Sequence, residues 1–259
     1  MNGEPKETKF PRLVLMGVAL RTFLVEAAWN YKGMQNLGFC SAIMPALKRV
    51  YSGQALIEAA KRHLSVFNTN PVFSGFIVGA IAEMERSSAA KGRPNEQLAE
   101  GMKSRLGGAF GAIGDELLWA SARPLLACLA VLMFLMGNDW AFLFMVGLFA
   151  SLSIWIRLVG VSRGACGGEA VREFLQRFNP GHLSLIMKRG TCVLLGAVLG
   201  VILCGGNAGI LGEIPPLVGV LIVAPVAVVA FIIRAKNVPA QGIAAALCGI
   251  SILCAFLIR

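Results

Sequence analysis

Long runs without a charged residue dominate the second half of the chain. Residues 216–233 and 240–258 are uncharged throughout, and residues 117–136, 141–156 and 191–203 have few or no internal charges. An upright α-helix needs about 20 apolar residues to cross a bilayer, and a shorter one crosses where the bilayer thins or protein covers it. The sequence therefore predicts an all-α integral membrane protein with about five transmembrane helices.

Composition agrees with lipid-facing surface. The 259 residues are 56% hydrophobic with a mean hydropathy of +0.71, more apolar than an ordinary soluble domain. The net charge of +10 is not arranged as a basic stripe with interleaved aromatic residues, so no nucleic-acid partner is expected. The basic residues cluster instead in residues 157–189 and at 234–236, whereas residues 138–140 and 207–215 carry none. The positive-inside rule then predicts a multi-pass protein with a cytoplasmic N-terminus.

The first half is less apolar. Residues 20–37, 43–51 and 54–67 show helical periodicity with charged faces, which predicts interfacial or cytoplasmic helices. Residues 72–82 are apolar but too short to cross, so a re-entrant segment is expected there, followed by a loop over 87–95. The predicted organisation is a cytoplasmic segment (1–19), amphipathic and re-entrant helices (20–115) and a transmembrane helical region (116–259).

No cofactor, metal or catalytic site is expected. The seven cysteines include no C-x-x-C pair and no histidine at zinc-ligand spacing. The glycine-rich residues 107–115 lack the preceding strand and the Gly-Lys-Ser/Thr ending of a phosphate loop. Those glycines favour close backbone approach or a broken helix. No nucleophile–base pair supports an autonomous membrane enzyme.

One polar trio lies in the predicted helix over residues 20–37. Glu26, Trp29 and Asn30 are spaced i, i+3 and i+4, which places a carboxylate, an indole and an amide on one helix face. Sugars are commonly held by that mixture, because polar groups take the hydroxyls and an aromatic ring takes the C–H face. An interfacial tryptophan anchor with solvated polar neighbours explains the same spacing.

A second polar group precedes the apolar residues 72–82. His63 and Asn68 flank the end of one predicted helix, and Asn70 precedes Pro71 as an N-cap residue would. Capping accounts for Asn70. Extra hydrogen-bonding side chains near membrane depth are costly unless paired, so His63 or Asn68 is also a candidate for lining a solute pathway.

One charged residue precedes the first long apolar run and another lies within it. Asp115 either caps a helix that begins at Glu116 or contacts a permeating solute. Arg123 lies about two turns into the run, where a base is either functional or extends to the cytoplasmic interface.

Several motifs in series resemble a known family, the membrane IID subunit of the mannose/fructose/sorbose-type sugar phosphotransferase system (PTS). They occur in the family's order over about residues 20–165: Ala28-Trp29-Asn30-Tyr31, Met34-Gln35-x-Leu37-Gly38-Phe39, Pro45-Ala46-Leu47, Arg62-His63-Leu64-x-x-Phe67-Asn68-Thr69-x-Pro71, and Gly111-x-x-Gly114-Asp115 followed by Trp119 and Arg123-Pro124.

The resemblance implies a helical subunit of the bacterial cell membrane that pairs with a IIC subunit in a hetero-oligomer and forms with it the pathway for a hexose-type sugar. It further implies that the cytoplasmic IIA and IIB components carry out phosphoryl transfer. The tentative pathway residues are Glu26, Trp29, Asn30, His63, Asn68, Asn70 and Asp115.

The chain departs from the family pattern at Glu26 and Ala28, where Gln and Ser are usual. A proline usual in the family is also missing from residues 108–112. The departures at Glu26 and Ala109 motivate an alternative, a non-transporting membrane scaffold or sensor subunit of phosphotransferase components.

Overall fold

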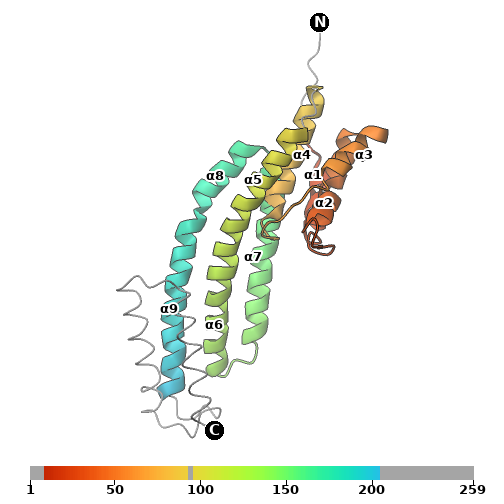
Figure 1. Cartoon of the computed structure of the whole chain (residues 1–259). Helices are drawn as coiled ribbons and strands as arrows, with labels where there is room; N and C mark the ends of the chain where they lie inside the picture. The colour runs from red at the N-terminus through yellow and green to blue at the C-terminus, as the bar shows by residue number, and fades with distance from the viewer. Residues whose placement is uncertain (1–8, 93–95, 205–259) are drawn as a thin grey trace, which may run out of the picture. The chain divides into compact units, whose positions relative to one another are not determined.

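The computed structural model describes residues 9–92 and 96–204. The chain divides into two compact units, Met1–Gly196 and Ala197–Arg259, and the packing and site described below belong to the first. The described part is all-helical. Its elements are α1 (Arg12–Thr22), α2 (Asn36–Val50), α3 (Gly53–Arg62), α4 (Ser74–Ala90), α5 (Glu96–Gly114), the π-helical segment η1 (Asp115–Ala122), α6 (Arg123–Leu135), α7 (Ala141–Gly164), α8 (Gly168–Phe178) and α9 (Pro180–Cys204) (Figure 1).

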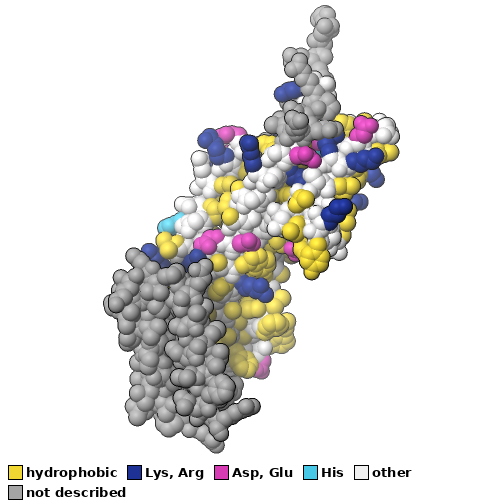
Figure 2. Space-filling view, in the orientation of Figure 1, with side chains coloured by type: hydrophobic (Ala, Val, Ile, Leu, Met, Phe, Trp, Pro, Cys, Tyr) yellow, Lys and Arg dark blue, Asp and Glu magenta, His cyan; other side chains and the backbone are white. Residues whose placement is uncertain are grey.

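Three helical runs within the described residues are long and apolar enough to cross a membrane. They are Ala99–Leu135, Ala141–Gly164 and Gly168–Ile202. The predicted spans 117–136, 141–156 and 191–203 coincide with parts of these runs to within one residue at their ends, which confirms an integral membrane fold. The predicted spans 216–233 and 240–258 lie outside the described residues, so the number five stays a prediction. Figure 2 shows hydrophobic side chains dominating the lower part of the visible face, over α6 and α7, with more charges above.

The helix predicted over residues 20–37 is wrong. α1 ends at Thr22 and α2 begins at Asn36, with turns between them. The break arises from tertiary pairing, because the backbone of Gln35 donates to Phe67 O at 2.8 Å and Phe67 N donates to Gly33 O at 3.2 Å. Met34 adopts φ +58°, which no helix tolerates. Long-range hydrogen bonds have therefore overridden local periodicity.

The loop predicted over residues 87–95 begins too early, because α4 continues to Ala90. The apolar residues 72–82 form the first part of this longer helix. Its buried side chains, including Phe76, Ile77 and Ile81, belong to the main hydrophobic core.

Two glycine pairs bring α4 and α7 into close contact. A Cβ added at Gly79 would lie 2.5 Å from Val161 O, and one at Gly164 would lie 2.5 Å from Phe76 O. Gly75 and Gly160 face the opposite backbone in the same way. Small residues four apart allow two helices to pack backbone to backbone, which is the usual basis of helix association in membranes.

Substituting Gly79 with Ala is expected to destabilise the fold by about 1–3 kcal/mol, because the new methyl group has no space. Gly147 is the matched control: it also lies in a helix, and a Cβ there meets nothing within 4 Å. Gly147→Ala is expected to be neutral or stabilising by up to about 1 kcal/mol. Thermal unfolding of both variants in detergent checks the difference. Equal effects would contradict close packing of α4 on α7.

Candidate functional site

The segment between α3 and α4 runs extended across glycines of α5. A Cβ added at Gly107 would lie 3.0 Å from Asn68 O, and one added at Gly114 would lie 2.5 Å from the Asn70 side chain. The predicted use of these glycines for close backbone approach is therefore confirmed. Because these glycines have no side chains, the polar residues 68–70 can lie against α5, which forms the first part of the run Ala99–Leu135.

Gln35 fixes this segment from the other side. Its side chain is buried, its Nε2 donates to Thr69 O at 2.9 Å, and its Oε1 accepts from Thr69 N at 3.0 Å. The same Nε2 lies 3.2 Å from Glu26 Oε1. A buried amide with both of its ends satisfied is a rigid support. Gln35 therefore couples the exposed carboxylate of Glu26 to the extended segment.

Asn70 joins the segment to Asp115. Its Nδ2 donates to Asp115 Oδ1 at 2.9 Å, and its Oδ1 accepts from Val72 N at 3.0 Å. The predicted N-cap at Asn70 is wrong, because α4 begins at Ser74 with Phe73 as its N-cap, and the Asn70 side chain instead holds the turn before the helix. The predicted cap at Asp115 is wrong, because Asp115 lies inside one continuous helical run. Asp115 is the first residue of η1, and π-helical turns occur frequently at functional sites.

We call the connected residues the amide site, which comprises Glu26, Gln35, Thr69, Asn70 and Asp115. Gln35 and Asn70 are each 2% exposed, whereas Glu26 and Asp115 are exposed. Thr69 Oγ1 is buried and has no hydrogen-bond partner among the described residues. Buried amides thus position carboxylates that remain accessible. This arrangement suits a ligand rich in hydroxyl groups.

Three predicted site residues lie apart from these contacts. Trp29 is 45% exposed and packs edge-on against Tyr31 with ring centroids 4.9 Å apart. Asn30 holds its own turn by accepting from Gly33 N at 2.8 Å. Because residues 23–35 are not helical, the predicted shared helix face of Glu26, Trp29 and Asn30 does not exist. The exposed Asn68 side chain makes no hydrogen bond to the described residues.

His63 belongs to a separate buried group, the Glu85 cluster, which comprises Tyr51, Arg62, His63 and Glu85. Glu85 Oε1 is 2.9 Å from both His63 Nε2 and Arg62 Nε, while Oε2 accepts from Arg62 Nη2 at 2.7 Å and Tyr51 Oη at 2.8 Å. His63 is 1% exposed. The geometry therefore ties the end of α3 to α4.

Protonation in the Glu85 cluster follows from burial and hydrogen bonding. Burial alone would raise the pKa of Glu85, but the hydrogen bonds from His63, Arg62 and Tyr51 lower it to about 2. Burial lowers the pKa of His63 despite its bond to Glu85, so a neutral ring donates from Nε2. Burial and then the bond to Glu85 raise the pKa of Tyr51 to about 12. The carboxylate is thus the group that stays charged beside Arg62.

Lys103 supports the same connection from α5. Its buried ammonium donates to His63 O at 3.1 Å and to Ser65 O and Ser65 Oγ, each at 2.9 Å. Nζ also lies 4.9 Å from the centroid of Phe39. An ammonium with three acceptors and an aromatic ring is well compensated for its burial. Lys103 therefore anchors the chain just before the amide site.

Sequence reasoning did not include Gln35, Thr69 or Arg157 among the candidate site residues, although Gln35 and Thr69 lie in the family motifs. The cluster of basic residues over 157–189 predicts a connection that begins at Arg157, but α7 continues through Arg157 to Gly164. Its guanidinium lies 4.8 Å over the Phe23 ring, and its buried Nε has no hydrogen-bond partner among the described residues. Glu26 interacts with it electrostatically. The signal available in the sequence was a base directly after an apolar run.

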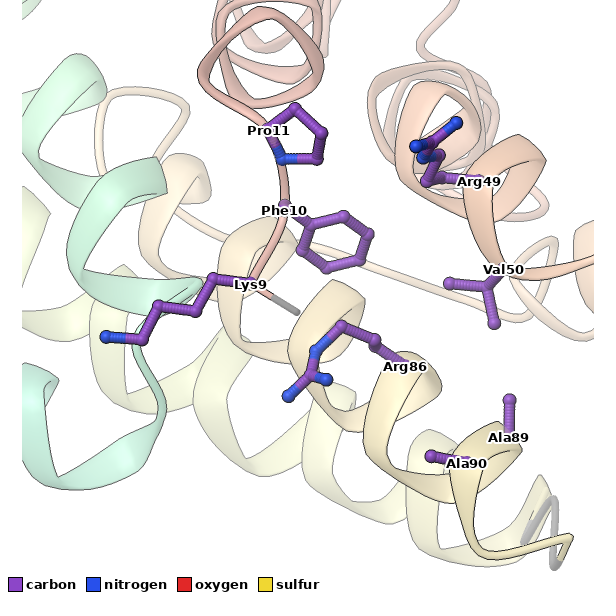
Figure 3. A pocket seen from close by; sticks show the side chains of 8 residues that line it. All are labelled: Lys9, Phe10, Pro11, Arg49, Val50, Arg86, Ala89 and Ala90. Atoms are coloured by element: carbon purple, nitrogen blue, oxygen red, sulfur yellow. The ribbon is translucent and has the colours of Figure 1, made fainter. Parts of the chain in front are cut away.

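A basic pocket elsewhere is not a preformed anion site. It has a volume of about 490 Å³ and lies between the start of α1 and the ends of α2 and α4. Figure 3 shows the charged groups of Lys9, Arg49 and Arg86 pointing in different directions around Phe10. Arg86 also pairs with Glu83 at 2.6 Å. The three cations do not converge on one ligand position.

The chain is similar to known phosphotransferase components. The family model for the PTS system mannose/fructose/sorbose family IID component (EIID-AGA) matches residues 12–203. The mannose-specific EIID component of Escherichia coli K12 is 31% identical over 182 residues, which are 68% of this chain and 64% of that protein. The sorbose-specific EIID component of Klebsiella pneumoniae is 30% identical, with 73% of this chain and 68% of that protein covered. The chain thus spans 64% of the length of the mannose-specific relative.

Two solved structures share the fold. One, described as a membrane protein, has a TM-score of 0.67 at 23% identity and covers 95% of this chain and 97% of its own. The other belongs to the cryo-EM structure of the mannose transporter ManYZ in complex with microcin E492, with a TM-score of 0.58 at 24% identity and coverages of 95% and 96%. At these identities the likeness establishes the helical membrane fold.

Proposed function

Because the chain belongs to the mannose/fructose/sorbose family of PTS IID components, we propose that it is the IID membrane subunit of a sugar transporter. In this proposal it forms the pathway for a hexose-type sugar together with a IIC subunit in the bacterial cell membrane. The observation that carries the proposal is the amide site, in which buried Gln35 and Asn70 position the exposed carboxylates of Glu26 and Asp115.

The chemistry of the amide site fits an uncharged polyhydroxyl solute. Carboxylates accept hydrogen bonds from sugar hydroxyl groups. A side-chain hydroxyl group such as that of Thr69 can both donate a hydrogen bond to a sugar oxygen and accept one from a sugar hydroxyl group. A site that hydrogen-bonds hydroxyl groups discriminates strongly against solutes that lack them, because its buried polar groups would then be left unpaired. This supports Glu26 and Asp115 as residues that face the sugar, with the buried Asn70 positioning Asp115.

Phosphoryl transfer is assigned to the IIA and IIB components rather than to this chain. Of its two histidines, His63 is 1% exposed and bonded to Glu85, so a soluble phosphoryl donor has no access to it. His182 is exposed, and its imidazole makes no hydrogen bond to the described residues that would activate it. Such an arrangement supports a transport subunit without catalysis of its own.

The orientation proposed is N-terminus in the cytoplasm. The connection between α6 and α7 (residues 136–140) carries Asp139 and no base, whereas basic residues follow at the opposite end of α7. This distribution supports a cytoplasmic location for residues 165–179 and an extracytoplasmic one for residues 136–140.

Uptake of labelled hexoses tests the function directly. Cells that supply IIA, IIB and IIC are compared with and without this chain, and uptake of at least one hexose is expected to require it. Lack of dependence for every hexose would overturn the transport function. The scaffold or sensor alternative instead predicts that Asn68→Ala and Asp115→Ala leave function intact while interface changes abolish complex formation.

A further inference from the structure

A groove between α6 and α7 presents one charged residue within an apolar wall. The groove has a volume of about 440 Å³, and its lining includes Trp119, Arg123, Phe142, Val146 and Phe149. The Arg123 guanidinium lies 5.4 Å from the centroid of the Trp119 ring. Arg123 is exposed and forms no hydrogen bond or ion pair with the residues that the structure describes. The ring is its one identified partner there.

The depth of Arg123 in the membrane follows from helix geometry. It lies 12 residues before Leu135, where the crossing run ends, and 7 residues after Glu116. At the 1.5 Å rise per residue of an α-helix the first separation is about 18 Å, and the second, which runs through the π-helical η1 with its smaller rise per residue, is at most about 10 Å. Glu116 is exposed and pairs with Lys188, so the polar boundary lies near Glu116. The guanidinium reaches back to Trp119, which is still about one turn short of that boundary.

A charged side chain at this depth requires a partner. An unpaired arginine costs about 2.5–3.5 kcal/mol at the centre of the bilayer on insertion scales, and charged residues within membrane helices almost always face protein or a polar cavity. A cation–π contact with Trp119 offsets part of this cost, typically about 0.5–2 kcal/mol. The occupant of the groove must therefore be apolar over most of its surface and must supply an acceptor, best a carboxylate, next to Arg123.

We infer that the groove receives a transmembrane helix of the partner IIC subunit, and that an Asp or Glu of this helix pairs with Arg123. The inference rests on the proposed function, since it takes IIC as the partner. Lipid acyl chains would match the apolar wall, but lipid phosphates lie at the boundary, about one helical turn beyond the guanidinium. Residues 205–259 of this chain contain a single acid, Glu213, which is the intramolecular alternative.

Co-purification tests the pairing. Tagged chain is co-expressed with IIC, membranes are solubilised, and the IIC recovered with wild type, Arg123→Glu and Arg105→Glu is quantified. Arg105 is the matched control, because it is an exposed base on the same helical run. Arg123→Glu is expected to lower IIC recovery at least tenfold, whereas Arg105→Glu keeps it at the wild-type level. Replacing the IIC acid at this depth with Lys is expected to restore recovery with Arg123→Glu.

The outcomes separate the inference from the proposed function. Thermal unfolding of each variant without IIC shows whether Arg123→Glu folds, and only a variant that unfolds like wild type is scored. If it does not fold, Arg123→Gln is scored in its place, with the same loss of IIC expected. Wild-type IIC recovery with the scored variant overturns the inference. In that case, loss of bound anionic lipid from the variant would identify lipid as the partner of Arg123, and equal changes in unfolding for the variant and Glu213→Gln would identify Glu213. Failure of the wild-type chain to recover any IIC counts against the proposed function itself.

Discussion

Asp115→Ala is expected to reduce sugar uptake at least tenfold in cells that contain the complete phosphotransferase complex. The substitution removes the acceptor for Asn70 Nδ2. It also removes one of the two negative charges in the first turn of η1, where Glu116 carries the other. A hydrogen bond to a charged group contributes about 1.5–3 kcal/mol, and every 1.4 kcal/mol is a factor of about ten. Initial uptake rates of labelled hexose, normalised to the amount of complex in the membrane, measure the effect.

Asp115→Asn separates positioning from charge. Its side-chain oxygen can still accept from Asn70, so a variant with intermediate uptake indicates that the negative charge itself contacts the solute. Asp139→Ala is the matched control, because Asp139 is an exposed acid in the 136–140 connection at the other end of α6. Its uptake is expected to equal that of wild type. Normal uptake by Asp115→Ala in an assembled complex would remove Asp115 from the pathway and favour the scaffold alternative.

Hydropathy was sufficient for the membrane helices of the described region but not for their ends. The apolar residues 141–156 predicted α7, yet the helix continues to Gly164 through Arg157. The extension depends on Gly160 and Gly164 packing against α4, which a window of hydrophobicity does not record. For the same reason Arg157 was placed in a loop rather than beside Phe23. Length and composition show that a helix crosses, whereas tertiary packing decides where it stops.

The candidate site was predictable in its parts but not in its connections. Asn70 and Asp115 were identified individually from capping chemistry and charge, and 45 positions separate them in the sequence. Gln35 lies in one of the family motifs, but its spacing did not indicate a site residue, because a glutamine in a helical pattern is ordinarily solvated. The side chain of Gln35 bonds both the N–H and the C=O of Thr69, which lies 34 positions away in the sequence. Such amide pairs arise only when the segments meet, so periodicity could not find them.

His63 illustrates the opposite error. A histidine near an apolar segment suggested a solute-facing residue, but its neighbours in space are the acid and bases of the Glu85 cluster. The relevant residue is Glu85, which is 3% exposed although Glu83 and Arg86 lie beside it in α4. A buried carboxylate is almost never unpaired, so it predicts cationic or donor partners from other helices. Which partners these are depends on the packing of α3 against α4.

Glu85→Gln is expected to destabilise the protein by about 3–5 kcal/mol, because it removes the carboxylate that Tyr51, Arg62 and His63 share. The amide is of nearly the same size, so lost charge rather than a cavity is responsible. For a domain of this size about 3 kcal/mol lowers the unfolding temperature by roughly 6–12 °C. Thermal unfolding in detergent at neutral pH measures it.

Glu83→Gln is the matched control on the same helix. Glu83 pairs with Arg86 three residues away at 2.6 Å, and the two side chains are 19% and 14% exposed. A local, partly hydrated pair of this kind contributes at most about 1 kcal/mol, so its loss is expected to be small. Equal destabilisation by both variants would contradict a special contribution of Glu85.

The pH profile identifies the charge as the cause. The pKa of Glu85 is about 2 in the folded protein and is ordinarily 4.5, so the unfolded chain binds the proton more tightly. The stability that Glu85 contributes is therefore fully present above pH 4.5 and is lost as the pH falls towards 2. Glu85→Gln has no proton to bind there, so its unfolding temperature is expected to fall less steeply over this window than that of wild type. Parallel profiles would show that hydrogen-bond geometry, rather than ionisation, holds α3 to α4.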